Sequence, residues 1–529
     1  MRQSYDAVVV GAGFGGLCML YRLRELGLRA RVFEAGSGVG GTWFWNRYPG
    51  ARCDVESLEY SYQFSDGLQQ EWEWTERYAS QPEILRYLNH VADRFDLRRD
   101  IALETRVVSA VFDEAADRWH VRTHDGAEVS ARFCIMATGC LSSTNTPAFP
   151  GLETFTGRTF HTGRWPHEPV DFGGRRVGVV GTGSSGIQAI PLIAEQAAHV
   201  VVFQRTPNFS VPARNHPLDP AVQRAVKRGY AALRERAGQM PFGFDTRPNE
   251  CSALDASPEE RRAEYEDRWR QGGLPFLGAF ADMIFSKEAN DTAADFIRAK
   301  ITGIVRDPAV AEALTPHTVV GCKRLCSDTD YFETFNRPNV TLVDVATAPI
   351  EAVTERGLRT ARAHYTLDDL VFATGFDAMT GALSRIDIRG REGVALRAKW
   401  AEGPRTYLGL SVAGFPNLFI ITGPGSPSVL SNMVPSIEQH ANWITACIAY
   451  VDAHGLRRIE ATREAEDAWV AHVNEVGDAT LYPSCNSWYL GANIPGKPRV
   501  FMPYLGFPAY VQKCDEVAAR GYEGFATSA

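Results

Sequence analysis

The order of apolar and polar positions near the N-terminus predicts a strand, a tight turn and an amphipathic helix in immediate succession. Residues 7–10 are apolar without interruption, as is typical of a parallel strand covered on both faces. The sequence Gly-Ala-Gly-Phe-Gly-Gly follows at residues 11–16, and leucines then recur at helical spacing over residues 17–26. A second apolar stretch, residues 30–33, leads to Glu34. This pattern predicts a βαβ unit with a glycine-rich first turn.

The glycine positions in this turn fit a bound dinucleotide. Gly11 permits the tight turn, Gly13 lets the backbone approach a pyrophosphate, and Gly16 lets the helix pack closely on the strand. The helix N-terminus offers amide hydrogens and the positive end of its dipole to the phosphates. Glu34 can accept hydrogen bonds from both hydroxyls of a ribose, which excludes a 2′-phosphate there. Residues 38–50 add a second glycine turn and several large aromatic residues, which favours FAD over NAD as the occupant.

The same pattern recurs later in the chain. Residues 176–180 predict a buried strand, and the turn Gly-Thr-Gly-Ser-Ser-Gly at residues 181–186 opens a helix in which Pro191 predicts a kink or an early break. The next strand, residues 199–203, is followed by Arg205 at the place where the first unit has its acid. A guanidinium without a neighbouring acid suits a ribose 2′-phosphate, so the predicted carrier is NADPH. Two dinucleotide sites in one chain predict electron transfer from NADPH to FAD.

The composition excludes several other classes of protein. The net charge is −8 with a pI near 5.9, and no basic stretch is present, so we expect no nucleic-acid partner. No apolar run approaches the roughly 20 residues that span a bilayer, and the N-terminus leaves no room for a signal peptide, so we expect a cytoplasmic protein without a membrane partner. The ten cysteines are scattered, and reduced thiols are expected. Cys322 and Cys326 lack further ligands nearby and are interpreted as structural, so no metal site is predicted.

A third signature lies between the two glycine-rich turns. Phe155, Gly157, His161, Trp165 and Pro166 satisfy the spacing Phe-x-Gly-x-x-x-His-x-x-x-Trp-Pro. In these residues the chain resembles the type I Baeyer–Villiger monooxygenases, and within them the phenylacetone monooxygenase-like branch. The resemblance extends from end to end of the chain, and further matching stretches are residues 46–54, 322–324, 373–377, 423–428 and 487–493.

The resemblance implies a reaction and the residues that perform it. NADPH would reduce FAD, O2 would add to the flavin at C4a, and the resulting peroxyflavin would convert a small-molecule ketone into an ester or a lactone. Arg324 is the implied catalytic cation, because its fixed charge would stabilise the peroxide and the oxyanion. Asp54 would hold Arg324 against the flavin. Lys323 and Arg205, with Thr206, would bind the 2′-phosphate.

The resemblance also implies the remaining site residues. The substrate pocket would contain Ser428, Val429, Leu430 and Met433, and a segment over residues 486–498 would fold across NADP. His161 is interpreted as part of the linker that transmits domain movement, not as a proton carrier. The residues implied in holding the two cofactors are Gly11, Gly13, Phe14, Gly15, Gly16, Glu34, Gly41, Thr42, Trp43, Trp45, Arg52, Cys53, Asp54, Tyr60, Val107, Thr182, Gly183, Ser184, Ser185, Gly186, Ile187, Gln188, Arg205, Thr206, Lys323, Arg324, Met433 and Trp488.

The predicted fold class is α/β, with two Rossmann-like, three-layer dinucleotide-binding domains. Residues 1–140 and 377–529 are expected to form the FAD-binding domain, and residues 141–376 the NADPH-binding domain. Within the latter, residues 213–318 are charged and are expected to form a helical insertion. Residues 257–260, Ser-Pro-Glu-Glu, predict the start of one of its helices through a capping box.

Three alternatives remain open at this point. A flavin monooxygenase that oxygenates amine nitrogen or sulfide sulfur would share both glycine turns, but its linker signature would lack the Trp165–Pro166 ending. A disulfide reductase would need a redox cysteine pair beside the flavin, and Cys53 has no such partner in the sequence. A non-catalytic NADP-binding protein would have no need of Asp54, Lys323 and Arg324. The ketone itself is left open among aromatic, cyclic, steroid-like and long-chain classes, and the oligomeric state is open, with a monomer as the simplest expectation.

Overall fold

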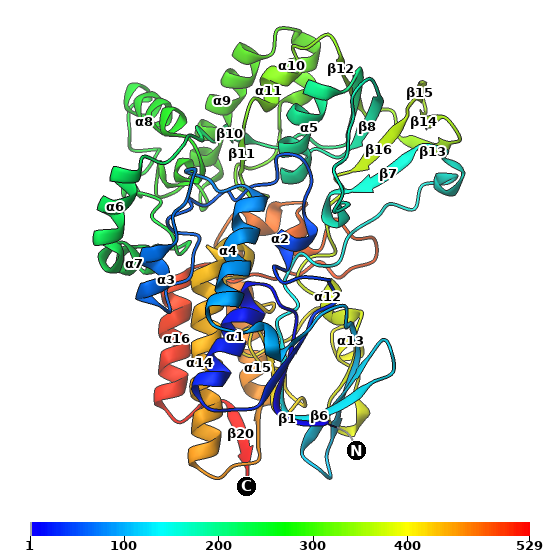
Figure 1. Cartoon of the computed structure of the whole chain (residues 1–529). Helices are drawn as coiled ribbons and strands as arrows, with labels where there is room; N and C mark the ends of the chain where they lie inside the picture. The colour runs from blue at the N-terminus through cyan, green and yellow to red at the C-terminus, as the bar shows by residue number, and fades with distance from the viewer. Residues whose placement is uncertain (1–2) are drawn as a thin grey trace.

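The first apolar stretch forms strand β1 (Gln3–Val10) at the centre of an eight-stranded sheet (Figure 1). This computed structural model describes residues 3–529 of the chain. The strand begins before the apolar run because its exposed first residues still pair with the neighbouring strand β6. Eight strands make up this first sheet: β17 (Asp387–Arg389), β4 (Val107–Asp113), β5 (Arg118–Thr123), β6 (Glu128–Met136), β1, β2 (Ala30–Phe33) and β3 (Ile101–Ala102) in this order, with β18 (Leu418–Ile420) paired to β6.

The register of the first sheet brings three strand ends together. Val10 of β1 pairs with Phe33 of β2 and with Met136 of β6, and all three strands are parallel. The residues that follow them, including Gly11 and Glu34, therefore lie at one edge of the sheet. The carboxyl edge of a parallel sheet is where α/β proteins bind ligands.

Helices on one face of the first sheet and smaller elements on the other create three layers. Val9 of β1 belongs to the core shared with α1 (Phe14–Glu25), α14 (Met433–Ala453) and α16 (Phe507–Ala519). Val8 points the other way, into a core formed with β4, β5, α12 (Gly381–Ser384) and α13 (Leu396–Lys399). This alternation is the two-residue period of a strand buried on both faces. Figure 1 shows these layers in the lower half of the molecule, with the C-terminus at its lower end.

The second glycine-rich turn belongs to a separate, fully parallel sheet. Its order is β12 (Val340–Asp344), β9 (His199–Gln204), β8 (Arg176–Val180), β16 (Asp369–Phe372) and β7 (Arg158–His161). Together the two sheets confirm the expected α/β class with two dinucleotide-binding units.

The helix after this second turn, α5 (Ser184–Gln196), continues past Pro191, so the predicted early break is wrong. A proline inside a helix removes one backbone hydrogen bond. Pro191 is buried, as are Ile190 and Ile193 beside it, and α5 packs on β8, β9 and α11 (Tyr331–Thr334). We attribute the continuity of the helix to this packing.

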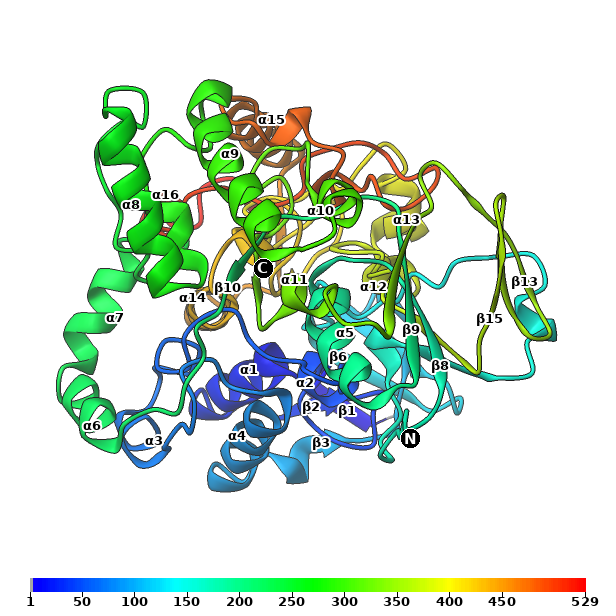
Figure 2. The same ribbon diagram turned by 90° about the horizontal axis from the view of Figure 1, so that it is seen from above.

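Helices fill most of the region between β10 (Ser210–Pro212) and β11 (Cys326–Asp328). The predicted capping box is confirmed: the Ser257 hydroxyl accepts from the Glu260 amide, and the Glu260 carboxylate accepts from the Ser257 amide. Figure 2 shows α6 to α8 at one end of the molecule and, at the other, the small sheet of β13 (Ile350–Thr354), β14 (Gly357–Thr360) and β15 (His364–Thr366). The helices are α6 (Pro220–Arg228), α7 (Tyr230–Gly238), α8 (Pro258–Gln271), α9 (Lys287–Ile304) and α10 (Pro308–Leu314).

The remaining elements complete the two units. They are α2 (Thr42–Trp45), α3 (Asp66–Glu71), α4 (Gln81–Arg94), β13 (Ile350–Thr354), β14 (Gly357–Thr360), β15 (His364–Thr366), β19 (Arg458–Ala461), α15 (Arg463–Asp478) and β20 (Phe525–Ser528). Across residues 3–529, no helix combines the length and the apolar character that crossing a bilayer requires.

The expectation that the cysteines are reduced thiols is wrong for one pair. Cys322 and Cys485 form a disulfide, with their Cα atoms 5.6 Å apart although the two residues are 163 positions apart in the sequence. Scattered positions gave no indication of this pair because the fold alone brings the two segments together. Within residues 3–529, which hold all ten cysteines, the other eight are free, and among them only Cys251 is exposed.

A buried carboxylate anchors strand β16 of the second sheet, between β8 and β7, and generates a stability prediction. The side chain of Asp369 is 0% exposed and accepts hydrogen bonds from Arg158 at 2.7 Å and from Arg175 at 2.5 Å. Asp369→Ala should lower the free energy of unfolding by about 2 kcal/mol, less than the loss for a fully buried pair, because both arginines are partly exposed to water. Urea unfolding followed by circular dichroism measures this.

Burial acts against the Asp369 charge, but hydrogen bonds from the two arginines outweigh it and lower the pKa of the carboxyl. Its contribution is therefore complete above the pKa of an unfolded aspartate and is lost as the pH falls through the folded value. The difference between the wild type and Asp369→Ala should shrink in acid. Glu351→Ala, which removes an exposed ion pair with Arg359, is the matched control and should change little. Equal effects of the two variants would contradict the prediction.

Candidate cofactor-binding and active site

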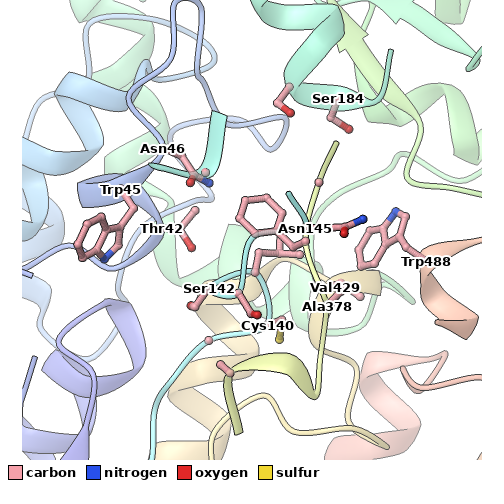
Figure 3. Close-up of a pocket in the computed structure, with 18 of the residues that line it drawn as sticks. Thr42, Trp45, Asn46, Cys140, Ser142, Asn145, Ser184, Ala378, Val429 and Trp488 are labelled. Atoms are coloured by element: carbon pink, nitrogen blue, oxygen red, sulfur yellow. The ribbon is translucent and has the colours of Figure 1, made fainter. Parts of the chain in front are cut away.

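A single cavity of about 1120 Å³ opens where the carboxyl edges of the two sheets face each other. It exceeds the roughly 300–1,000 Å³ of a typical small-molecule pocket, as a site for two dinucleotides requires. In Figure 3, side chains from the N-terminal third (Thr42, Asn46), the second glycine turn (Ser184) and the C-terminal segment (Trp488) surround one space. The predicted residues that line the cavity are Gly11, Gly13, Phe14, Gly15, Glu34, Gly41, Thr42, Trp43, Trp45, Arg52, Cys53, Asp54, Tyr60, Val107, Thr182, Gly183, Ser184, Ser185, Gln188, Arg205, Thr206, Lys323, Arg324, Val429, Met433 and Trp488.

Other predicted residues lie behind the cavity wall. A Cβ on Gly16 would lie 1.8 Å from the carbonyl oxygen of Gly11, and a Cβ on Gly186 would lie 2.3 Å from that of Gly181. These glycines let each helix pack against its own turn, as the sequence pattern predicts for Gly16. The remaining predicted residues outside the lining are Ile187, Ser428, Leu430, Phe155, Gly157, His161 and Trp165.

The turn after β1 has the geometry of a pyrophosphate cradle. Gly13 caps helix α1 without any side-chain hydrogen bond, so the first amides of the helix lack an internal partner. A Cβ on Gly13 would lie 3.2 Å from the Cα of Gly41, so the two glycine turns nearly touch beside the cavity. Gly41 has a φ of 54°, a conformation that favours glycine. Uncapped amides at an open helix N-terminus fit the phosphates of a dinucleotide.

Glu34 is held rigidly at the end of β2. Its carboxylate accepts hydrogen bonds from the Ala12 amide and from the Gly36 amide, both at 2.7 Å. The residue is 5% exposed and lines the cavity. Each carboxylate oxygen retains acceptor capacity beyond its one amide contact, so the predicted contact with ribose hydroxyls fits the geometry.

The second turn repeats this arrangement and adds two cations. Gly183 caps α5 without a side-chain bond, and a Cβ there would meet no atom within 4 Å, so the turn faces open space. Arg205 and Lys323 line the cavity, and within residues 3–529 neither side chain has an ion pair or a hydrogen bond. Burial, and after it repulsion from Arg205, lowers the pKa of Lys323. Two close cations without a carboxylate fit a phosphate group between them.

Arg324 is fixed from two sides. Its Nε donates to Oδ2 of Asp54 at 2.5 Å and its Nη2 to Oδ1 at 3.0 Å, which makes the pair bidentate. Its Nη1 donates to the carbonyl oxygen of Val429 at 2.8 Å. Burial opposes the charge, but the attraction of Asp54 and its hydrogen bonds outweigh burial and raise the pKa of Arg324 above its ordinary value. The guanidinium therefore stays charged at every working pH.

A glutamine joins the two sheets next to this pair. Gln188 on α5 accepts a hydrogen bond from the Tyr48 hydroxyl at 2.8 Å and donates to the carbonyl oxygen of Arg52 at 3.2 Å. The Arg52 side chain is held in turn by Glu76 at 2.5 Å. The loop that carries Asp54 is thus attached to the helix of the second unit.

His161 contributes to the chain crossing between the units, not to the cavity. Its Nδ1 accepts from the Gly163 amide at 3.0 Å, so Nε2 carries the proton toward the Asn145 carbonyl oxygen at 3.4 Å. The Thr374 hydroxyl lies 3.3 Å from the same Nε2. Burial lowers the pKa of His161, which favours the neutral ring. These contacts join β7 to both segments that connect the two sheets.

Sequence reasoning missed several residues of the cavity wall. Tyr48 and Asn145 line it and form the contacts described above. Three arginines that were not predicted as site residues, Arg106, Arg164 and Arg385, also line it. Arg106 and Arg164 adjoin residues that were predicted, Val107 and Trp165, so position next to a motif was the only available signal.

Comparisons with known proteins agree with this geometry. A family model described as "Pyridine nucleotide-disulphide oxidoreductase" matches residues 8–250. A "Baeyer-Villiger monooxygenase" of Pseudooceanicola batsensis is 45% identical over 98% of this chain and 95% of its own length. A phenazine N-monooxygenase of Lysobacter antibioticus is 43% identical over 99% of this chain and 97% of its own. The structure titled "Oxidized steroid monooxygenase bound to NADP" is 57% identical, with a TM-score of 0.95 over 99% of this chain and 100% of that one.

Full-length identity at this level and a shared fold establish the relationship that the linker fingerprint indicates. The chain belongs to the Baeyer–Villiger monooxygenase family.

Proposed function

We propose that this protein is an FAD-containing monooxygenase that uses NADPH and O2 to convert ketones into esters or lactones. The observation that supports this most strongly is the position of Arg324. A permanently charged guanidinium, held by Asp54 and by the Val429 carbonyl, lies in the cavity into which both glycine turns open. Membership of the Baeyer–Villiger family and a close structural relative titled as bound to NADP support the same conclusion.

Bound FAD would supply the oxygen-activating centre and bound NADPH the hydride that reduces it. The task of this chain's own residues is to stabilise negative charge that develops on the ketone oxygen. Arg324 can do so because its donors are oriented before the reaction begins. Asp54 fixes the direction of the guanidinium, and the Val429 carbonyl limits its rotation.

The choice between NADPH and NADH would rest on the two cations beside the second glycine turn. Arg205 and Lys323 supply charge for a 2′-phosphate, and Thr206 follows at the end of the same strand-to-loop connection. NADH lacks this phosphate, so it would leave the two cations repelling each other. We therefore assign NADPH as the physiological donor.

The substrate would lie between the flavin side and the C-terminal segment. Val429, Met433 and Trp488 supply apolar surface to the cavity. Ser428 and Leu430 are buried next to Val429 but do not line the cavity. The Ser428 hydroxyl lies 3.5 Å from the Cys140 sulfur. Their proposed role is to position Val429.

The domain assignment follows the sheets. We propose that residues 1–140 and 377–529 hold FAD, because β1 to β6 together with β17 and β18 belong to one sheet. Residues 141–376 would hold NADPH, because the other parallel sheet lies within them. His161 would transmit movement between the two through its contacts with residues 145 and 374.

A second candidate is oxygenation of nitrogen or sulfur. This candidate is supported by the relative named as a phenazine N-monooxygenase, which is 43% identical to this chain over 99% of its length. An amine or sulfide attacks oxygen as a nucleophile and develops no oxyanion on carbon. The two candidates therefore differ in what they require of Arg324.

A panel of substrates tests the proposal. Purified, FAD-loaded protein is given NADPH, O2 and one ketone at a time, from small cyclic ketones to steroids, and products are identified by mass spectrometry. We expect esters or lactones one oxygen atom heavier than the ketone, with NADPH consumed in step. Parallel reactions in which a phenazine or a sulfide replaces the ketone should be slower. Oxygenated amine without any ester, or NADPH consumption that yields only hydrogen peroxide, would contradict the proposal.

The coenzyme site generates a prediction with a pH signature. Arg205→Gln should weaken NADPH binding about 10- to 100-fold, the range expected when one charged hydrogen-bonding partner is lost, and should leave NADH binding nearly unchanged. Arg356→Gln, an exposed arginine outside the cavity, is the control. Fluorescence titration of each coenzyme measures both effects.

The pKa of Lys323 is lowered, so the amine loses its charge at a lower pH than an ordinary lysine does. The dissociation constant of NADPH should therefore rise as the pH increases through this lowered pKa. The dissociation constant of NADH should stay nearly constant over the same pH range, because NADH has no 2′-phosphate. Lys323→Met should abolish the difference in pH dependence. Parallel curves for the two coenzymes in the wild type would refute the assignment.

A further inference from the structure

The disulfide joins two segments, distant in the sequence, that both contribute to the cavity wall. Cys322 adjoins Lys323 and Arg324, and all three line the cavity. Cys485 begins the segment that contributes Asn486, Trp488, Ala492 and Asn493 to the same cavity. A covalent bond thus links the loop with the candidate cations to the segment expected to cover the coenzyme.

No other bond duplicates this link. Across residues 3–529, no hydrogen bond or ion pair connects residues 319–324 with residues 485–493. The far end of the covering segment is held separately, because the Asn493 side chain donates to the carbonyl oxygen of Phe376 at 2.7 Å. The Tyr489 carbonyl oxygen accepts from the Met502 amide at 3.0 Å, and the Asn486 side chain accepts from Arg499 at 2.7 Å. Cleavage of the disulfide would leave these contacts in place but would remove the bond between the segment and the loop that carries Lys323 and Arg324.

We propose that Cys322 and Cys485 form a reversible redox site: the disulfide retains the nicotinamide coenzyme by closing the 485–493 segment, and the dithiol releases it. This inference rests on the proposed coenzyme site. A crosslink between distant residues removes conformational freedom chiefly from the open form, which favours the closed one. Both sulfur-bearing residues are buried, at 4% and 7% exposure, but Cys322 reaches the cavity, so a small oxidant or dithiol has access through it.

The chemistry balances with hydrogen peroxide as oxidant. One thiol loses its proton and attacks the peroxide as the thiolate, the O–O bond breaks, and a sulfenic acid and hydroxide form; the released proton converts the hydroxide into water. The second thiolate attacks that sulfur, the S–S bond forms, and the oxygen leaves as a second water. Two electrons pass from the sulfurs to the two oxygens. An external dithiol reverses the step by exchange and is itself oxidised to a disulfide.

The test uses the FAD-loaded full chain after treatment with hydrogen peroxide or with dithiothreitol. Free thiols are counted by alkylation in denaturant, and NADP+ affinity is measured by titration without ketone. We expect eight free thiols in the oxidised protein, the number of unpaired cysteines, and all ten after reduction. Reduction should raise the dissociation constant of NADP+ about fivefold or more, the lower end of coupling between linked sites.

Two variants complete the design. Cys485→Ser should bind NADP+ as weakly as the reduced wild type and should not respond to either reagent. Cys251→Ser removes an exposed, unpaired thiol and should respond as the wild type does. Reduction of the wild type gives the same information if Cys485→Ser does not fold.

Ten free thiols after peroxide treatment would overturn the proposal, and so would eight thiols with equal NADP+ affinity in both states. Absence of NADP+ binding in either state would refute the coenzyme assignment, and this proposal with it. Because the thiol count needs neither coenzyme nor turnover, the two failures are distinguishable.

Discussion

The bidentate pair between Asp54 and Arg324 is the contact on which the site depends. Its members are 270 residues apart in the sequence. Asp54 comes from the loops that follow the first βαβ unit, and Arg324 from the chain that returns from the helical region to β11. The Val429 carbonyl adds a third segment. The proposed catalytic cation can occupy this position only if the two sheets face each other across the cavity.

That orientation follows from a simple property of parallel sheets. Strands that run the same way end at the same edge, so β1, β2 and β6 place their loops together, and β8 and β9 do the same in the other sheet. Gln188, Tyr48 and the Arg52 backbone then join the two edges through hydrogen bonds. The cavity is thus made by both units, and its charge comes from residues of both.

Local sequence patterns were sufficient for the parts of this arrangement that depend on neighbours in the chain. The glycine turns, the strand ends and the Ser257 capping box all follow from residues a few positions apart, and the structure has them where the pattern predicts. The family resemblance pointed to Arg324 and Asp54, which do pair, although no spacing rule could have joined them.

Features that depend on the packed chain were not predictable. Pro191 does not break α5, which continues through it in a buried setting. Cys322 and Cys485 meet only because the fold brings their segments within 5.6 Å at the Cα atoms. Val429 lines the cavity, whereas its neighbours Ser428 and Leu430 do not. The three residues form one short helical turn, in which consecutive side chains point in different directions.

The most direct measurement is a double-mutant cycle on Asp54 and Arg324, with flavin reduction by NADPH and ester formation followed separately. Arg324→Ala should still be reduced but should lose ester formation about 10²- to 10³-fold, as expected for a lost oxyanion donor. Asp54→Ala should lose less, and the double variant should be no worse than Arg324→Ala, because the carboxylate acts through the guanidinium. Losses that multiply in the double variant, or ester formation that survives in Arg324→Ala, would contradict the account.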